Sequence, residues 1–397
     1  MKILYLTLED ISLHKGSVVH IREIVSGLHA RGHTVGLLAR NRGGIKETDF
    51  CFYNLQPTSS WWGPVKRLQT STYLLSSLFL FFSLWYLLPR YEVVYARDFH
   101  TVLIAWMPRW VFGKKLVYEI NGLASEEVKL KGNSYGVRLF SMLIRGAERM
   151  ATLSADLIIS VTPQIASYLV TRFHVSPNRV EIVGNGVDPE KFLPIRDPAL
   201  LNDWRKRLGI EEKDRVIGFV GNLAPWQGID ILIESALHLL SRMEELKFLI
   251  VGDGVMKPRL LTRVTEQGLG RAFIFTGMMS YETVPVLINL TDICVAPFIA
   301  RRNKETGVSP LKVFEYLACG KPVIASRIEG LEVIERTGVG ILVEPQDSAD
   351  IESALLKLLK DPHLCREMGR RGVEVAREEF SWESRVATIE HLLTGLA

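Results

Sequence analysis

The chain has 397 residues, of which 47% are hydrophobic, and a formal net charge of +4. This length suits two domains that each bury their own core, and the composition is ordinary for an α/β protein, which disfavours a membrane-embedded or disordered chain. The charge is too small and too scattered to indicate nucleic-acid binding, although it leaves room for an anionic surface.

The cysteines and the N-terminal segment indicate the compartment. The four cysteines share no metal-ligand spacing, which favours buried thiols in a reducing compartment: Cys51, Cys294, Cys319 and Cys365. Met1 leads directly into the apolar run KILYLTL, without the charged start and cleavage site of a signal peptide. We therefore expect a cytoplasmic protein.

Strand and helix patterns alternate along the first half of the chain. Strands are expected at residues 3–8, 35–39, 93–96, 116–120 and 157–161, and a helix is expected over 18–31. Such alternation predicts a parallel sheet with helices on both faces.

The pattern restarts at Val216 and predicts a second unit of the same kind. A strand and a glycine turn are expected in IGFVGNL, then a helix over 229–240, and strands at 247–251, 273–276, 293–296, 322–325 and 340–343. A hinge is expected in the turn-rich stretch 184–198, which holds three prolines and two glycines.

The segment from Tyr73 to Leu88, YLLSSLFLFFSLWYLL, departs from this order because it is apolar on every face. A membrane span needs about 20 residues, so this segment is short for one. Three interpretations stay open: a buried helix, a helix lying in a membrane interface, and a transmembrane helix. The flanking aromatic and basic residues would suit the interfacial interpretation, and they are Trp61, Trp62, Lys66, Arg67 and Arg90.

The stretch from Gly307 to Ser326, GVSPLKVFEYLACGKPVIAS, carries the strongest functional signal. Gly307 and Ser309 open a turn, and a helix is expected over 311–318, whose free N–H groups and dipole favour a phosphate. Glu315 lies one turn inside that helix, where its carboxylate can accept hydrogen bonds from a ribose diol. The pattern predicts a nucleoside diphosphate site, and the alternative is an ordinary Rossmann-type helix with a capping or solvated glutamate.

Five motifs in order resemble family 4 retaining glycosyltransferases: residues 16–23, LHARGHTV at 28–35, VEIVGNGVDPEKF at 180–192, VGDG at 251–254, and the 307–326 block. The resemblance implies the GT-B fold, an α/β architecture of two Rossmann-like domains that face each other across a cleft. Residues 1–186 would bind the acceptor and residues 187–378 the nucleotide sugar. Residues 379–397 would form a helix that crosses back to the first domain.

The resemblance also implies a set of site residues. Donor-binding residues would be Gly16, Ser17, Asn222, Gln227, Gly277, Met278, Gly307, Val308, Ser309, Leu311, Lys312 and Glu315. Candidate catalytic residues are Lys312, Asn121 and His100, where Asn121 stands at a position that many relatives fill with a histidine. Asparagine cannot shuttle a proton near neutral pH, which suits a mechanism in which the departing diphosphate takes the acceptor's proton.

The sequence breaks the family pattern in the turn after the first strand of the second domain. Relatives carry an arginine and, five residues later, a lysine that clamp the diphosphate, whereas this chain has Asn222 and Gln227. Gly307 replaces the first glutamate of a two-glutamate motif, and Pro310 removes one N–H. Either the cations have moved to Arg301, Arg302, Lys304 and Lys312, or the chain is a binding protein descended from an enzyme.

No Asp-x-Asp pair occurs in the sequence, so we expect no metal and no cofactor besides the donor substrate. The expected activity is metal-independent, retaining hexosyl transfer from a nucleoside diphosphate sugar to a lipid-linked or cell-surface glycan in cell-envelope polysaccharide biosynthesis. Association with the inner face of the cytoplasmic membrane would run through Tyr73 to Leu88. A nucleotide-sugar epimerase or isomerase and a catalytically inert sugar-nucleotide binder stay open as alternatives.

Overall fold

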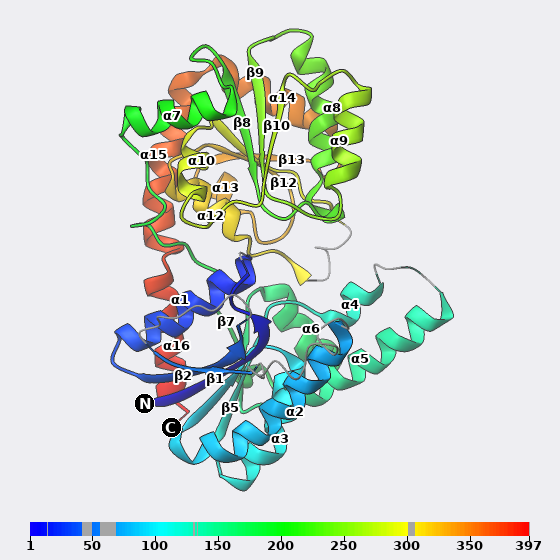
Figure 1. The fold of residues 1–397 in the computed structure, drawn as a ribbon, viewed down its shortest axis with the longest axis vertical. Coiled ribbons are helices and arrows are strands. Elements are labelled where there is room, and N and C mark those ends of the chain that lie inside the picture. The colour runs from blue at the N-terminus through cyan, green and yellow to red at the C-terminus, as the bar shows by residue number, and fades with distance from the viewer. Residues whose placement is uncertain are drawn as a thin grey trace, which may run out of the picture. The chain divides into compact units, whose positions relative to one another are not determined.

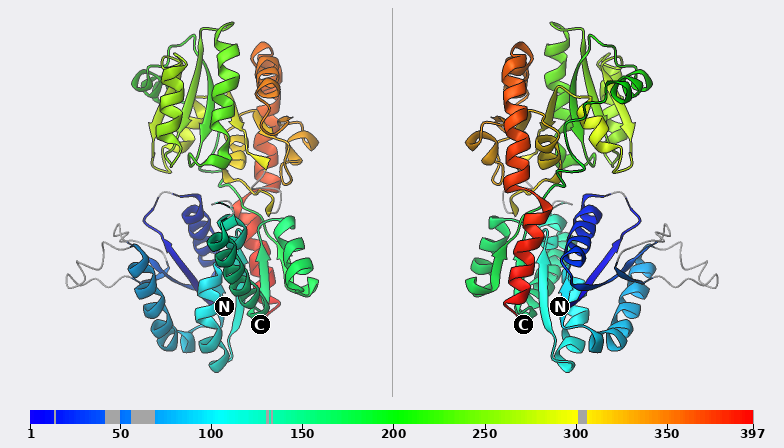
Figure 2. Two further views of the ribbon diagram at one scale, coloured as in Figure 1. Left: turned by 90° about the vertical axis from the view of Figure 1, so that its right-hand side faces the viewer. Right: turned by 90° about the vertical axis from the view of Figure 1, so that its left-hand side faces the viewer.

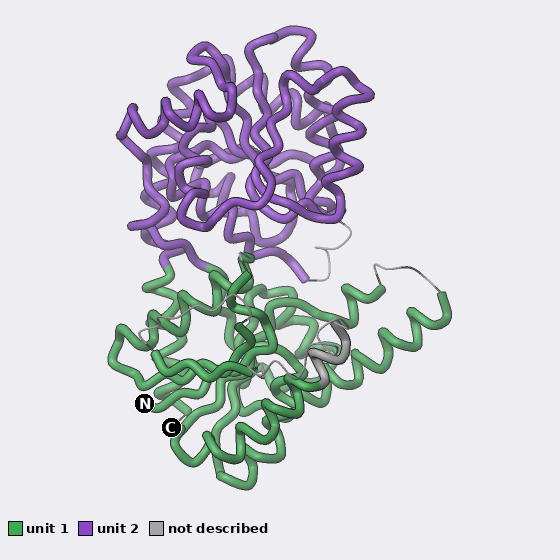
Figure 3. Tube along the Cα trace, viewed as in Figure 1, with its two compact units in different colours: residues 1–185, 382–397 green, residues 186–381 purple. Residues whose placement is uncertain are grey.

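The computed structural model describes residues 1–13, 15–41, 50–55, 69–129, 132, 134–300 and 306–396, without the side chains of 69–74. The chain forms two compact units, Met1–Asn185 with Trp382–Ala397, and Gly186–Ser381 (Figure 3). The chain returns from the second unit to the first after Ser381, whereas the expected final segment began at residue 379. The C-terminal helix belongs to the first unit, as the fold class predicted.

The first unit is built on a seven-stranded sheet of order β3-β2-β1-β4-β5-β6-β7, paired in parallel throughout (Figure 1). Its strands are β1 (Lys2–Asp10), β2 (Thr34–Arg40), β3 (Cys51–Asn54), β4 (Val93–Ala96), β5 (Lys115–Ile120), β6 (Leu157–Ser160) and β7 (Val180–Ile182). The two edge strands β3 and β7 were not expected from the sequence. Both are short and neither is fully buried, so they lack the apolar run that identifies a central strand.

The helices of the first unit are α1 (Gly16–Ala30), α2 (Gln69–Leu87), α3 (Phe99–Val111), α4 (Ala124–Lys129), α5 (Tyr135–Ser154), α6 (Pro163–Phe173) and α16 (Trp382–Thr394), with 3₁₀ turns η3 (Leu88–Arg90) and η4 (Pro177–Arg179). Leu84 of α2, Val102 of α3 and Ala151 of α5 share one core cluster with the sheet. The buried residues of α1 and α16 lie outside that cluster, and these two helices pack on each other (Figure 2).

The apolar segment 73–88 lies largely within α2, and it is buried on one side only. Leu80 and Leu84 are buried, whereas Phe82 and Tyr86 are exposed. Burial of the whole helix is therefore not observed. Among the helices of the described residues, none is both long enough and apolar enough to cross a bilayer.

The second unit has a six-stranded parallel sheet of order β10-β9-β8-β11-β12-β13, made of β8 (Arg215–Val220), β9 (Leu246–Val251), β10 (Phe273–Gly277), β11 (Ile293–Ala296), β12 (Val323–Ser326) and β13 (Gly340–Val343). Its helices are α7 (Pro198–Leu208), η5 (Pro225–Gln227), α8 (Ile229–Leu240), α9 (Lys257–Glu266), α10 (Val284–Asn289), α12 (Leu311–Ala318), α13 (Val333–Arg336), α14 (Ser348–Lys360) and α15 (Pro362–Glu379). The expected helices at 229–240 and 311–318 are found with the same bounds. Two parallel α/β units confirm the predicted fold class.

Candidate functional site

Three glycine turns follow β8, β9 and β10, and backbone hydrogen bonds join them. The Gly221 N–H donates to the Val251 carbonyl at 2.9 Å, and the Gly252 N–H donates to the Gly277 carbonyl at 3.0 Å. A Cβ at Gly252 would clash with the Gly221 carbonyl oxygen, so this close approach of two backbones requires glycine. The turns form the carboxyl edge of the sheet, where open α/β sheets bind their ligands.

Lys312, in the first turn of α12, extends its side chain to the turn after β8. Its Nζ donates a hydrogen bond of 2.6 Å to Oε1 of Gln227 and lies 3.9 Å from the centroid of the Phe219 ring. A Cβ at Gly221 would lie 2.7 Å from the same Nζ. The ammonium group therefore occupies the turn in which the sequence lacks the expected cations. Asn222 lies in the same turn and is exposed.

Burial pushes the pKa values of Lys312 and Glu315 toward each other. Loss of solvation lowers the pKa of Lys312 to about 7, and only the nearby Glu315 charge acts in the opposite direction. Burial likewise raises the pKa of Glu315 to about 7, against the lowering effects of Lys312, a hydrogen bond with Tyr281 and the charge of Lys191. The Lys191 Nζ lies 4.4 Å from the Tyr281 ring centroid. Sequence reasoning assigned no role to Tyr281, which belongs to no recognised motif, or to Lys191, which lies within the motif at 180–192.

The turn before α12 presents free backbone donors. Gly307 adopts a left-handed conformation with φ of +61°, and the Val308 N–H donates to the Glu329 carbonyl at 3.2 Å. The N–H groups of Leu311 and Lys312 have no acceptor among the described residues. Free N–H groups at the start of a helix can bind an anion. Ser309 belongs to this turn, whereas Arg301, Arg302 and Lys304 lie outside the described residues.

The turn after β10 lies beside an ion pair that sequence reasoning missed. Gly277 has a φ of +74°, and Met278 is exposed. Lys257 Nζ and Asp253 Oδ2 are 2.8 Å apart, and a Cβ at Gly277 would lie 3.3 Å from that Nζ. The spacing of Asp253, the aspartate of the VGDG motif, and Lys257 at i and i+4 is the signal that could have identified the pair.

Gly16, which is exposed, and Ser17, which is half-buried, form the start of α1 in the first unit. The N–H groups of Val18 and Val19 donate to the Lys15 carbonyl, whereas those of Gly16 and Ser17 have no acceptor among the described residues. The start of α1 is therefore a second place where free N–H groups point out of a helix.

A buried polar cluster surrounds Glu119, at the carboxyl end of β5. Its Oε1 lies 2.7 Å from His20 Nε2 and accepts a hydrogen bond of 2.5 Å from Asn121 Nδ2, and its Oε2 accepts one of 2.7 Å from the Tyr95 hydroxyl. Burial alone would raise the pKa of Glu119, but the charges of His20 and Arg97 and the hydrogen bonds of His20 and Asn121 lower it to about 2. The cluster therefore holds a charged carboxylate that orients Asn121.

His20 links this cluster to the point where the chain leaves the first unit. Its Nδ1 lies 2.6 Å from Oδ1 of Asn185, and its ring meets the Trp382 ring edge-on at a centroid distance of 5.3 Å. Asn185 and Trp382 are the residues of the first unit that border the second. His20 of α1 therefore contacts the residue at which the chain leaves the first unit, Asn185, and the residue at which it returns, Trp382.

His100 lies outside the Glu119 cluster. Its side chain is 60% exposed, its Nδ1 is 3.6 Å from Asp98 Oδ1, and its ring centroid is 3.8 Å from that of Phe99. No hydrogen bond or ion pair joins it to Asn121 within the described part of the chain. The structure brings Asn121 together with His20 and Glu119, and it does not bring His100 to them.

Two stretches of the chain match models of glycosyltransferase families. Residues 14–191 match Glycosyltransferase Family 4, and residues 202–375 match Glycosyl transferases group 1. The two stretches lie one after the other and together span most of both compact units.

Curated relatives carry glycosyltransferase names. D-inositol 3-phosphate glycosyltransferase of Geodermatophilus obscurus is 29% identical over 319 residues, which are 78% of this chain and 67% of that protein. 2-deoxystreptamine glucosyltransferase of Streptomyces kanamyceticus is 27% identical over 245 residues, which are 61% of each protein.

Solved structures bear on the fold. Sucrose-phosphate synthase from Thermosynechococcus elongatus matches with a TM-score of 0.81 at 22% identity, over 100% of this chain and 98% of that one. Anabaena HepE in complex with UDP-glucose matches with a TM-score of 0.76 at 18% identity, over 100% of both chains. Its two parallel α/β units, the paired family matches and its named relatives identify this protein as a glycosyltransferase of family 4 with the GT-B fold, an enzyme that acts on sugar-nucleotide donors.

Proposed function

We propose that this protein is a retaining, metal-independent glycosyltransferase that moves a hexose from a nucleoside diphosphate sugar to a lipid-linked or cell-surface glycan in cell-envelope polysaccharide biosynthesis. The position of the Lys312 ammonium carries the proposal. The Lys312 Nζ lies 2.6 Å from Oε1 of Gln227. Gln227 occupies one of the two positions at which the resemblance led us to expect a cation. The missing charge is thus supplied from another element of the same unit.

In this proposal the donor diphosphate binds the free N–H groups of Leu311 and Lys312 and the Lys312 ammonium. Glu315 accepts hydrogen bonds from the ribose hydroxyls, and the Gly277 turn receives the base beside Met278. Negative charge on the diphosphate grows as the bond to the sugar breaks, so a fixed cation stabilises the transition state more than the bound substrate. The UDP-glucose complex of Anabaena HepE supports a nucleoside diphosphate sugar as donor.

Retention follows in this proposal from a reaction on one face of the sugar, where the departing diphosphate oxygen takes the acceptor's proton. Asn121 has no proton to exchange near neutral pH, and its amide is bound to Glu119. We assign Asn121 to orienting a sugar hydroxyl. His100 is exposed and stays a candidate on the acceptor side.

Moving the lysine along the chain tests the role of Lys312. Lys312→Gln should lower turnover by more than about tenfold and donor affinity by less, because the lost charge acts mainly on the leaving group. Adding Gln227→Lys to that variant should recover part of the rate, because it returns an ammonium to the same turn. Turnover and donor dissociation constants of both variants are measured by steady-state kinetics and calorimetry.

Lys247→Gln is the matched control, because this lysine lies on β9, where its Nζ donates to the Arg271 carbonyl. Equal turnover in the single and double variants, with both folded, would mean that the diphosphate is held in another way. A parent protein that binds donors and transfers to no acceptor would favour an inert binder.

Metal independence is supported by the absence of an Asp-x-Asp pair from the sequence. Within the described residues, no three acidic, histidine or cysteine side chains gather into a metal site. We expect turnover to survive an excess of chelator and to be unchanged by added Mg²⁺ or Mn²⁺. Activity that disappears with chelator and returns with either metal would refute this part of the proposal.

The proposed acceptor class relies on the helix within Tyr73 to Leu88. Phe82 and Tyr86 of α2 are 67% and 68% exposed, which suits contact with the inner face of the cytoplasmic membrane. A lipid-linked acceptor would be met at that surface.

A further inference from the structure

Exposed apolar side chains gather on α3 and α5 of the first unit. On α3, Trp106 is 53% exposed and Trp110 is 77% exposed. On α5, Phe140, Met142 and Leu143 are 55%, 70% and 65% exposed. α3 and α5 pack on each other, and exposed apolar side chains that gather on neighbouring elements mark interaction sites.

The charged side chains of these two helices are mostly basic. They carry four arginines, Arg109, Arg138, Arg145 and Arg149, and one acid, Glu148. Glu148 is buried and accepts a hydrogen bond of 2.6 Å from the Ala124 N–H. Asp156 lies 2.8 Å from Arg109, whereas neither Arg138 nor Arg149 has an acidic partner in the described part of the chain. The surface therefore offers exposed positive charge beside exposed aromatic rings.

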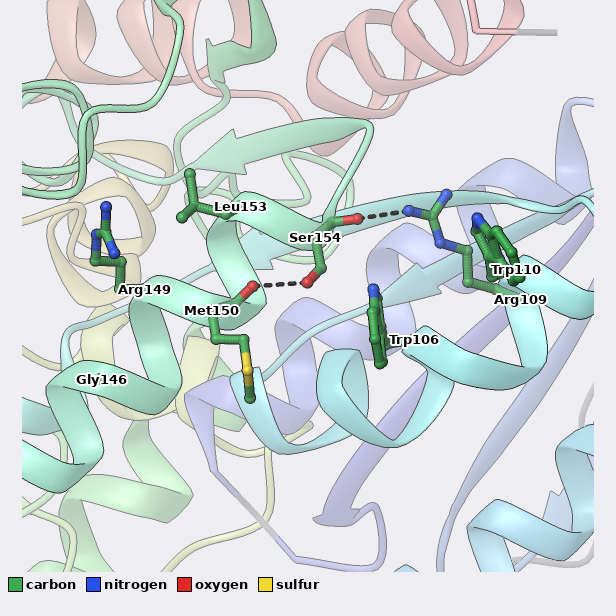
Figure 4. A pocket seen from close by; sticks show the side chains of 8 residues that line it. All are labelled: Trp106, Arg109, Trp110, Gly146, Arg149, Met150, Leu153 and Ser154. Atoms are coloured by element: carbon green, nitrogen blue, oxygen red, sulfur yellow. Dashed lines mark hydrogen bonds between the residues drawn. The ribbon is translucent and has the colours of Figure 1, made fainter.

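A shallow groove of about 770 Å³ runs between the two helices (Figure 4). Trp106 and Trp110 line it from α3, and Met150 and Leu153 line it from α5. Figure 4 shows Arg149 at one end of the groove and Trp110 at the other, with Trp106 and Met150 between them. Apolar side chains thus line the middle of the groove, with Arg149 at one end and Arg109 beside Trp110 at the other.

We propose that this α3–α5 surface docks on a lipid bilayer that contains anionic phospholipid. Tryptophan rings favour headgroup depth, where their apolar bodies and N–H groups are both satisfied. Arginine binds phosphate in two-pronged geometry, and each basic residue near an anionic bilayer strengthens binding to it. The absence of an exposed acid from both helices, as described, is the charge complementarity that favours this partner over a protein of mixed charge.

Docking of the α3–α5 surface extends the membrane contact that we propose for α2, and it rests on that part of the proposed function. It does not depend on the transfer chemistry. α3 packs against α2 and against α5, so the three helices are neighbours. Membrane contact was expected from the sequence only at Tyr73 to Leu88, which lies largely within α2.

The experiment measures sedimentation of the full chain with vesicles of phosphatidylcholine alone and of phosphatidylcholine with phosphatidylglycerol. The parent should bind the anionic vesicles far more tightly than the neutral ones. Arg138→Glu with Arg149→Glu should weaken that binding by more than about tenfold, because two attractions become repulsions. Trp106→Ser with Trp110→Ser should weaken it comparably by removing interfacial apolar surface.

The matched control reverses a charge and removes an exposed apolar residue elsewhere, with Lys206→Glu and Leu200→Ser on α7. This control should bind vesicles like the parent. A parent that ignores anionic vesicles, binds neutral ones equally well, or keeps full binding in both α3–α5 variants would overturn the inference. The inference would also be overturned if the parent bound no vesicles but formed a dimer in ultracentrifugation, and if both α3–α5 variants lost that dimer. The surface would then be an interface between two copies of this chain.

Two further measurements separate this inference from the proposed function. Phe82→Ser with Tyr86→Ser tests the α2 contact alone, and loss of binding only in that variant would leave α3 and α5 without a role. Stabilisation by nucleotide sugars and turnover with a water-soluble acceptor should be unchanged in the α3–α5 variants.

Discussion

The position of the Lys312 ammonium could not be predicted from the sequence. The absence of a cation from positions 222 and 227 is visible in the sequence, and the helix that carries Lys312 was predicted with its observed bounds. The direction of a long side chain depends on the packing of Phe219 and the glycine turn around it, which no local pattern encodes. The 2.6 Å contact with Gln227, 85 residues away, could therefore not be predicted.

The same residue should lower the stability of the second unit. In the folded protein the pKa of Lys312 falls from 10.5 to about 7, so between these values the unfolded chain binds more protons. The resulting penalty is full below about pH 7 and is relieved as pH rises toward 10. The pKa of Glu315 is raised from 4.5 to about 7, so its penalty is absent below pH 4.5 and full above about pH 7.

We expect Lys312→Met to be more stable than the parent at neutral pH and nearly inactive. Replacing the lysine by an apolar side chain of similar length removes the cost of desolvating its charge, and Glu315, whose pKa is raised to about 7, can become neutral by binding a proton, so the free energy of unfolding should rise. The gain should shrink as pH rises from about 7 toward 10.5, because the parent's lysine is then neutral in the folded state and begins to lose its proton in the unfolded state. Urea unfolding at neutral and alkaline pH measures both effects. A variant that is less stable than the parent at pH 7 would show that the ammonium is structural.

At the scale of elements, the sequence predicted what periodicity and turn residues determine. The central strands, α8 and α12 were found because each has its own apolar pattern and its own glycine or proline boundary. The Glu119 cluster was missed because its members come from α1, the ends of β4 and β5, and Asn185, and they meet only once the sheet has formed. An acid inside the buried strand β5 was the available signal, since an unpaired buried carboxylate is too costly to occur alone.

Glu119→Gln should destabilise the first unit by roughly 3–5 kcal/mol, because it leaves the buried Arg97 and His20 without their carboxylate. The folded pKa of about 2 is below the ordinary glutamate value of 4.5, so the carboxylate's contribution is present above pH 4.5 and is lost as pH falls toward 2. The variant should lack that acid-dependent loss. Urea unfolding from neutral to acidic pH measures it.

Glu92→Gln provides the control, because this exposed carboxylate accepts a hydrogen bond from the Lys2 N–H in the same unit. Its effect should stay within about 0.5 kcal/mol. Similar losses in the two variants would mean that the His20 and Arg97 contacts add nothing beyond an ordinary surface carboxylate.

At the scale of the whole molecule, the first unit is assembled from two distant parts of the chain. Trp382, Val386, Ile389 and Leu393 of α16 are buried in it, and Glu390 pairs with His33 at 2.8 Å. Gly27 of α1 allows close contact, since a Cβ there would meet the Val386 side chain at 2.6 Å. The family motifs predicted this return of the chain, whereas the exposed face of α3 and α5 carries no motif.

A chain ending at Ser381 should keep a folded second unit and a first unit of much lower stability. Removing α16 exposes the apolar side of α1, and each lost buried side chain costs about 1.5–3 kcal/mol. Scanning calorimetry should show one transition near its original temperature and one at a lower temperature or absent. A chain that ends at Gly395 is the control and should melt like the parent. Two unshifted transitions in the shorter chain would mean that α16 adds no stability to the first unit.

The return of the chain to its first unit has a consequence for synthesis on the ribosome. Residues 382–397 are made only after the whole of Gly186–Ser381, so the first unit waits for its closing helix while an entire second unit is translated. The second unit is continuous in the chain and can complete its core as it emerges. During that interval the nascent first unit exposes the α1 surface that α16 later covers, which makes it the part of the polypeptide that chaperones would bind.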